Sequence, residues 1–156
     1  MEGIRIKGQI GVVGGGECHG EIYEIAREVG GEIARRGFSL VCGGLGGVME
    51  AACRGAKEES GITVGILPTS NKRDANPYVD IVIPTGLGHA RNILVVHASD
   101  AIVAIDGGEG TLSEIAIALK VGKPIVGIKT WELGGRVPMA KGGREAVAML
   151  MGMLKL

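Results

Sequence analysis

The residues whose types and spacing point most clearly to ligand binding follow a short apolar run at positions 101–105. After Asp106 comes a turn with three glycines, Gly107, Gly108 and Gly110, and a segment with helical spacing opens at Thr111. Glycines between a strand and a helix let the backbone approach a ligand closely, and the free N–H groups of a first helical turn favour an anion. Thr111 can cap the helix or contact the ligand itself. The turn is therefore predicted to bind phosphate, with glycines kept only for a tight turn as the alternative.

Two other apolar runs also end in glycines. Residues 9–13 lead into Gly14, Gly15 and Gly16, and residues 38–42 lead into Gly43, Gly44, Gly46 and Gly47. The first turn lacks the third glycine of the dinucleotide fingerprint, because His19 stands in its place. In the second, Cys42 and Gly43 stand where a dinucleotide enzyme commonly carries an acidic residue for the ribose. Both features argue against NAD binding. For the second turn, tight packing and phosphate binding are equally open as explanations of its glycines.

Two charged residues could act on a ligand held at these turns. Arg91 lies in the first turn of a predicted helix over 90–98, where the helix dipole opposes a cation. Anion or substrate binding is our preferred explanation for it, and a surface salt bridge is the alternative. Glu114 lies one helical turn beyond the glycines of the third turn. His89 could cap the helix or contact the ligand, and His97 is predicted to be a partly buried packing residue.

The elements that must position these residues alternate along the chain. Strands are predicted over 9–13, 38–42, 62–67, 79–83, 101–105 and 123–128. Helices are predicted over 21–36, from the second glycine turn to about 58, and over 90–98, 111–122 and 144–154. In the helix over 90–98, Ile93, Leu94 and Val96 or His97 are expected to turn inward. This alternation indicates an α/β fold with a doubly wound, mainly parallel sheet of about six strands, Rossmann-like. The three glycine turns would then meet at the carboxyl edge of the sheet, where the ligand site is expected.

Length and composition restrict the classes of function. The chain has 156 residues, a formal net charge of +0 and 3% aromatic residues, which predicts one domain over 1–156 without the basic field or stacking platforms that nucleic acids need. No apolar run is long enough to cross a membrane, and no secretory signal is seen. Cys18, Cys42 and Cys53 show no CxxC spacing and are interpreted as reduced packing thiols. We expect a soluble cytoplasmic protein with no metal site and no resident cofactor, acting on a small phosphorylated ligand.

With these residues placed, the chain resembles the LOG family, once labelled lysine-decarboxylase-like, and the similar molybdenum-cofactor carrier proteins. Residues 43–49 (GGLGGVM) are similar to the family stretch GGGxxGLMG after the second strand, which adds Met49 to the candidate ligand contacts. Residues 107–114 (GGEGTLSE) are similar to the family motif PGGxGTxxE after the fifth strand. The family's motif arginine precedes its motif glutamate by 23 positions, as Arg91 precedes Glu114. The resemblance covers nearly the whole chain.

The resemblance implies a phosphoribohydrolase that splits a nucleoside 5′-monophosphate into free base and ribose 5-phosphate, without a metal and as a homo-oligomer, either a dimer or a tetramer. It implies that Arg91 and Glu114 form the catalytic pair. A carboxylate can stabilise oxocarbenium character at the sugar and activate water, and the arginine can position ribose or phosphate. The implied ligand-binding residues are Gly14, Gly15, Gly43, Gly44, Gly46, Gly47, Met49, Gly107, Gly108, Gly110 and Thr111.

The sequence departs from the family pattern at four positions. Asn92 replaces the lysine of an Arg-Lys pair, and carboxylates replace a proline, an aromatic residue and a glycine at Asp106, Glu109 and Glu50. These carboxylates would weaken phosphate binding unless they are turned away. A non-catalytic carrier for a nucleotide or a phosphorylated pterin, such as molybdenum cofactor, is therefore the alternative to the hydrolase. A nucleotide sensor or regulatory subunit is a third hypothesis.

Overall fold

A computed structural model describes the chain except for residues 1–2, 4 and 156. Within the described residues, six strands form one sheet in the order β4-β3-β2-β1-β5-β6, and all neighbouring strands run parallel. This confirms the predicted α/β, Rossmann-like class. The strands are β1 Gln9–Gly14, β2 Ser39–Cys42, β3 Thr63–Leu67, β4 Ile81–Pro84, β5 Ala101–Ile105 and β6 Ile125–Ile128.

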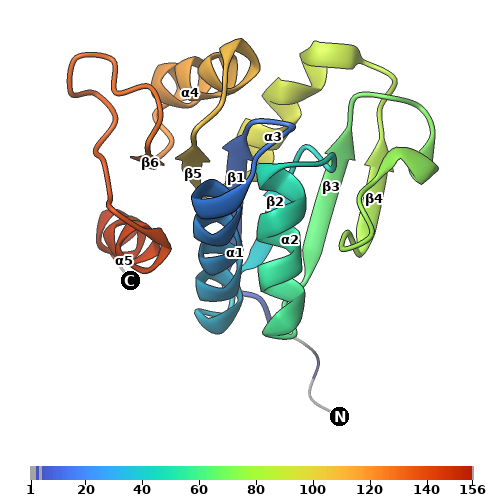
Figure 1. Ribbon diagram of the computed structural model, residues 1–156, viewed down its shortest axis with the longest axis horizontal. Helices are drawn as coiled ribbons and strands as arrows, with labels where there is room; N and C mark the ends of the chain where they lie inside the picture. The colour runs from blue at the N-terminus through green and yellow to red at the C-terminus, as the bar shows by residue number, and fades with distance from the viewer. Residues whose placement is uncertain (1–2, 4, 156) are drawn as a thin grey trace.

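The helices cover both faces of this sheet, as Figure 1 shows, with α1, α2 and α5 on one face and α3 and α4 on the other. The sheet's side chains alternate between two apolar cores, so that Val12 packs toward α1 and α2 while Val13 packs toward α3 and α4. The helices are α1 Gly20–Arg35, α2 Val48–Glu58, α3 Asn92–Ala98, α4 Glu109–Val121 and α5 Gly143–Met153. Two 3₁₀ turns, η1 Lys72–Asp74 and η2 Gly88–Arg91, complete the described elements. No helix among the described residues has the length and apolar character needed to cross a membrane.

The strand order reverses between β1 and β5. The chain moves outward from β1 through β2 and β3 to β4, then returns through α3 to place β5 on the other side of β1. Gly14 at the end of β1 pairs in register with Ile105 at the end of β5. The turns that follow β1, β2 and β5 therefore meet at one edge of the sheet, which is where a doubly wound fold binds its ligands.

Close packing of α1 against α2 fixes one wall of that edge. A Cβ atom added at Gly30 would lie 1.8 Å from the carbonyl oxygen of Ala52, and one added at Gly55 would lie 1.8 Å from that of Arg27. The two helices thus approach each other at positions where only glycine fits. The position of α2 in turn fixes the glycine turn that precedes it.

Some sequence-based expectations were wrong in detail. The fourth strand begins at Ile81 rather than 79, the helix predicted from 90 begins as the 3₁₀ turn η2, and α4 begins at Glu109 rather than 111. Ile93 and Leu94 are 46% and 40% exposed rather than turned inward, and His97 is exposed as well. The reason is that α3 has only seven residues, and Val95 and Val96 already fill its sheet-facing side.

Candidate functional site

A cavity of about 320 Å³ lies at the carboxyl edge of the sheet, where the strand order reverses. The turns after β1, β2 and β5 form its walls together with η2 and the start of α3. Its lining residues are Gly14, Gly15, Gly16, Leu45, Met49, His89, Arg91, Asn92, Gly108, Glu109, Gly110, Thr111 and Glu114. The structure thus brings together eight of the residues chosen from the sequence: Gly14, Gly15, Met49, Arg91, Gly108, Gly110, Thr111 and Glu114. Five others lie outside this lining, namely Gly43, Gly44, Gly46, Gly47 and Gly107.

The glycines outside the lining are needed for the packing of the turns. Gly47 has a φ of 63°, and a Cβ there would lie 2.3 Å from the carbonyl oxygen of Gly15. Gly107 has a φ of 91°, and a Cβ there would lie 2.1 Å from Oγ1 of Thr111. The structure thus shows tight packing at Gly47 and Gly107. This was the alternative to phosphate binding for both of these turns.

Gly108 and Gly110, in contrast, face open space, since a Cβ added at either would meet no atom within 4 Å. Gly108 is the residue that precedes α4, and its carbonyl accepts from the N–H of Leu112 at 3.0 Å. The N–H groups ahead of Leu112 belong to the first turn and have no partners within the helix. The start of α4 therefore presents free donors and the positive end of a helix dipole to the cavity.

Arg91 is the cation of the cavity, and it is only 8% exposed. Nη1 donates to Oδ1 of the neighbouring Asn92, and Nη2 donates to the carbonyl oxygen of Gly43 at 3.4 Å. Within the part of the chain that the structure describes, Nε of Arg91 is buried without a hydrogen-bond partner. Burial lowers the pKa of Arg91, although the charge of Glu114 opposes the effect. A buried guanidinium with a donor to spare is costly unless an anion binds to it.

Glu114 is the carboxyl group of the cavity, 7% exposed and one turn into α4. Burial raises the pKa of Glu114 to about 7, while the charge of Arg91 acts in the opposite direction. Both side chains lie among the described residues, and they form no direct ion pair with each other. A carboxyl group that titrates near neutral pH can act as an acid or as a base.

The carboxylates that depart from the family pattern are placed differently from one another. Glu109 lines the cavity and is exposed. Glu50 and Asp106 lie outside the lining, and their charges act on Cys18, whose pKa is raised by burial first and then by these two groups. Only one of the three carboxylates therefore faces the ligand space directly.

Sequence reasoning did not include Gly16 and Leu45 among the ligand contacts, and it missed the role of Asn92. It treated Asn92 only as a departure from a family pair, but its side chain is 4% exposed and accepts from Arg91. Its position next to Arg91 was the available signal. Within the described residues, no group of three or more His, Cys, Asp or Glu side chains is arranged to hold a metal ion.

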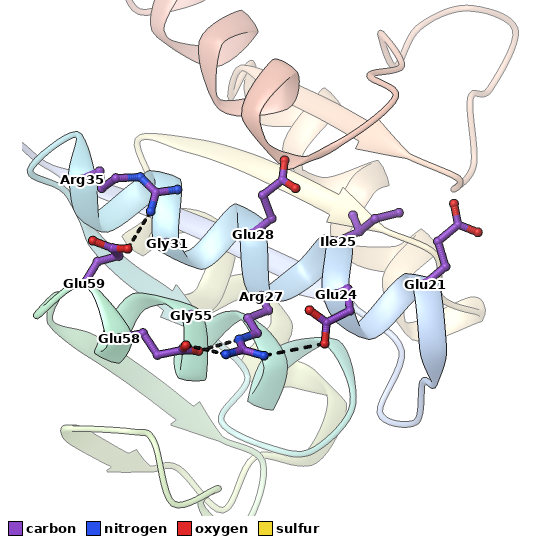
Figure 2. A pocket seen from close by; sticks show the side chains of 10 residues that line it. All are labelled: Glu21, Glu24, Ile25, Arg27, Glu28, Gly31, Arg35, Gly55, Glu58 and Glu59. Atoms are coloured by element: carbon purple, nitrogen blue, oxygen red, sulfur yellow. Dashed lines mark hydrogen bonds and ion pairs between the residues drawn. The ribbon is translucent and has the colours of Figure 1, made fainter.

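A second cavity of about 370 Å³ lies between α1 and α2 and is rich in charge. Figure 2 shows Arg27 paired with Glu58 and Glu24 and Arg35 paired with Glu59, whereas Glu21 and Glu28 are drawn without a partner among the lining residues. Arg27 Nε donates to Glu58 Oε1 at 2.6 Å, and Arg35 Nη1 donates to Glu59 Oε1 at 2.7 Å. Both guanidinium groups thus have carboxylate partners in partly exposed positions, and these pairs link the two helices. Among the described residues, this lining holds no buried side-chain donor without a partner.

Two relatives match this chain in sequence. One, described as an uncharacterized protein of Archaeoglobus fulgidus, is 55% identical over 78% of this chain and 80% of its own length. The other is the cytokinin riboside 5′-monophosphate phosphoribohydrolase of Mycobacterium tuberculosis, 37% identical over 72% of this chain and 65% of its own length.

Among the solved structures that match nearly the whole chain are two proteins described as binding or carrying molybdenum cofactor. The molybdenum cofactor binding protein of Rippkaea orientalis has a TM-score of 0.88 and 36% identity, over 97% of this chain and 99% of its own. The molybdenum cofactor carrier protein of Chlamydomonas reinhardtii has a TM-score of 0.85 and 36% identity, over 96% of this chain and 100% of its own. The model of the SLOG cluster4 family matches residues 7–152. The chain therefore belongs to the SLOG cluster4 family.

Proposed function

We propose that this protein binds or carries a small phosphorylated ligand, a phosphorylated pterin of the molybdenum-cofactor type, in the cavity at the carboxyl edge of the sheet. One observation carries the proposal. Arg91 is buried in the lining, its Nε donor has no partner among the residues that the structure describes, and the free N-terminus of α4 lines the same cavity. These are the features of an anion site, and the volume of about 320 Å³ is at the small end of the range for ligand pockets.

The placement of the ligand follows from the polarity of the lining. The phosphate would lie at the first turn of α4, where Gly108 and Gly110 leave open space above the backbone. Arg91 would donate to it with a charge-assisted hydrogen bond. The pterin would extend toward the turns after β1 and β2, where Leu45 and Met49 supply apolar contact.

The solved relatives support a carrier. Two structures described as binding or carrying molybdenum cofactor match this chain over nearly their full lengths. The phosphoribohydrolase relative is matched over 65% of its length, at a similar identity. The pterin assignment rests on this difference in coverage together with the anion site.

Direct titration tests the proposal. We would measure by calorimetry the binding of 6-hydroxymethylpterin monophosphate, of the same pterin without phosphate, and of AMP. The phosphorylated pterin should bind at least about tenfold more tightly than the unphosphorylated one, because hydrogen bonds to a charged group contribute about 1.5–3 kcal/mol. Equal affinity for the two pterins would contradict phosphate recognition, and a clear preference for AMP would favour a nucleotide ligand.

A phosphoribohydrolase is the second candidate, and the buried carboxyl of Glu114 favours it. A group that titrates near pH 7 beside an anion site could stabilise a developing oxocarbenium ion and activate water. The test is incubation with a panel of nucleoside 5′-monophosphates, with release of free base followed by chromatography and Glu114→Ala as the control. Base release that disappears in the variant would establish the hydrolase, whereas no release together with pterin binding would support the carrier.

We also propose that the protein is a homo-oligomer whose contact involves the outer surface of α3 and α4. Ile93, Leu94 and Val121 are 46%, 40% and 44% exposed on these helices. Apolar side chains gathered on one surface favour association. Leu94→Glu should reduce the mass measured by light scattering, and an unchanged mass would contradict a contact at this surface.

A further inference from the structure

We propose that Asn92 is a positioning residue, which holds the guanidinium of Arg91 away from Glu114 and so keeps the ligand cavity open while it is empty. The inference deepens the proposed function and rests on it in one respect, namely that Arg91 and Glu114 are the charged groups that contact the ligand.

A chain of three hydrogen bonds carries the inference. Oδ1 of Asn92 accepts from Nη1 of Arg91, and its Nδ2 donates to Oγ of Ser113 at 3.1 Å. Oγ of Ser113 donates in turn to the carbonyl oxygen of Gly110 at 2.6 Å. The chain therefore joins Arg91 to the first turn of α4. The amide of Asn92 supplies both halves of it, since its carbonyl accepts and its NH₂ group donates.

This chain of hydrogen bonds, the tether, opposes the electrostatic attraction between Arg91 and Glu114. The ionised form of Glu114 carries the charge opposite to that of Arg91 in the same cavity. Both side chains are more than nine-tenths buried, and Coulomb attraction grows as water is excluded. Both belong to the described residues, yet they form no direct ion pair. The other hydrogen bond of the guanidinium, to the carbonyl of Gly43, is long at 3.4 Å. Asn92 is thus the main group that competes with Glu114 for Arg91.

The remaining groups around Glu114 do not explain the separation. Cys42 is fully buried at the end of β2. The charges of Arg91 and Glu114 both act on the pKa of its thiol, but they are the smallest causes of its shift. His89 and Glu109 line the same cavity from η2 and α4, and both are exposed. Neither makes a hydrogen bond or ion pair with Arg91 among the described residues.

The test uses the ligand-free protein, so it is independent of any binding assay. NMR would follow the pH titration of the Glu114 carboxyl and the water exchange of the Arg91 Nε–H in wild type, Asn92→Leu, Asn92→Asp and Ser113→Ala. In Asn92→Leu the released guanidinium should pair with Glu114, lowering the pKa of Glu114 by about one pH unit or more. Asn92→Asp keeps an acceptor for Arg91 and should show no such fall. Ser113→Ala removes only the far end of the tether and should give a smaller fall.

Asn71→Leu is the matched control. Oδ1 of Asn71 also accepts a hydrogen bond, from the N–H of Arg73 at 2.9 Å, but on the exposed η1 turn. It should leave the pKa of Glu114 and the exchange of Arg91 unchanged. An unchanged or raised pKa of Glu114 in folded Asn92→Leu would overturn the proposal, with folding checked by thermal melting. If that variant does not fold, Ser113→Ala decides, and a Glu114 pKa equal to that of wild type overturns the tether.

Discussion

Two clusters of charged residues in this molecule differ in their burial and in whether their charges are paired. At the carboxyl edge of the sheet, the described residues Arg91 and Glu114 are buried, share a cavity and form no direct ion pair with each other. Between α1 and α2, Arg27 is paired with Glu58 in partly exposed positions. The shifts in pKa follow the same division, because burial raises the pKa of Glu114 whereas the hydrogen bond from Arg27 lowers that of Glu58.

The size and the number of charged groups of these two cavities do not indicate which of them binds a ligand. The cavity between α1 and α2 is the larger, at about 370 Å³ against 320 Å³, and it holds more charged groups. Its two guanidinium groups are already paired with carboxylates, so an anionic ligand would have to displace existing ion pairs. Among the described residues, the cavity at the sheet edge contains a buried donor without a protein partner and a free helix N-terminus, both of which a bound anion would satisfy.

The largest expected effect comes from removing the buried cation. Arg91→Ala should weaken the binding of 6-hydroxymethylpterin monophosphate by about 10- to 100-fold, because a charge-assisted hydrogen bond contributes about 1.5–3 kcal/mol. Arg27→Ala removes a cation from the other cluster and should leave the affinity unchanged. Calorimetric titration of both variants checks the contrast, and equal affinities for the two would remove the basis for distinguishing the clusters.

The second prediction concerns the pH dependence of stability at Glu114. The pKa of this group is about 7 in the folded protein and near its ordinary value of 4.5 in the unfolded chain, so the folded state holds its proton over the intervening range. Stability is therefore lost as the pH rises from about 4.5 to 7, and Glu114→Gln removes the loss. At pH 8 the variant should be more stable than wild type by about 3 kcal/mol, an advantage that disappears at low pH.

Denaturant unfolding across this pH range measures the difference. Glu58→Gln provides a test of opposite sign. The pKa of Glu58 is lowered, so its contribution is present at neutral pH and is lost as the pH falls through its folded value. A stability difference for Glu114→Gln that does not change with pH would contradict the buried, unpaired state of that carboxyl.

The third prediction separates glycines that face the ligand from glycines that pack the turn. Gly110→Ala adds a methyl group in open space and removes a flexible residue from a helix, so the protein should become more stable by about 0.5–1 kcal/mol. Binding of the phosphorylated pterin should nevertheless weaken, since the methyl group would occupy part of the cavity. Gly107→Ala should destabilise the fold, because its Cβ would meet Thr111 at a φ of 91°.

The smallest effect is expected in the cluster between α1 and α2. Arg27→Ala should reduce the melting temperature slightly, and the reduction should shrink in high salt, because exposed ion pairs contribute little and are screened. Thermal melting at two ionic strengths measures it. A large loss that salt does not alter would show that the cluster acts as a buried pair.

The sequence predicted the arrangement of the fold better than the ends of its elements. Alternation of apolar runs and helical segments is a strong signal for a parallel sheet, and the structure has that sheet. The split of the predicted helix at η2 could not be foreseen, because 3₁₀ and α turns share the same local residue preferences. The exposure of Ile93 and Leu94 was also missed, since the apolar pattern does not show that the sheet-facing side was already filled.

Within the site, the sequence identified eight of the residues that line the cavity but not the contacts between them. Arg91 and Glu114 were chosen from motif spacing, and both line the cavity. The burial that raises the pKa of Glu114 depends on packing from several strands, which no local pattern encodes. The same holds for the chain from Asn92 through Ser113, which spans 21 positions of sequence.

The measurement that tests the central claim most directly is the identification of the ligand that the protein retains. We would purify wild type, Arg91→Ala and Arg27→Ala from a host that makes molybdenum cofactor, denature each, oxidise the released material and quantify fluorescent pterin per chain. The account predicts pterin bound to wild type and to Arg27→Ala, and little or none bound to Arg91→Ala. Absence of pterin from wild type, or equal amounts in all three proteins, would contradict it.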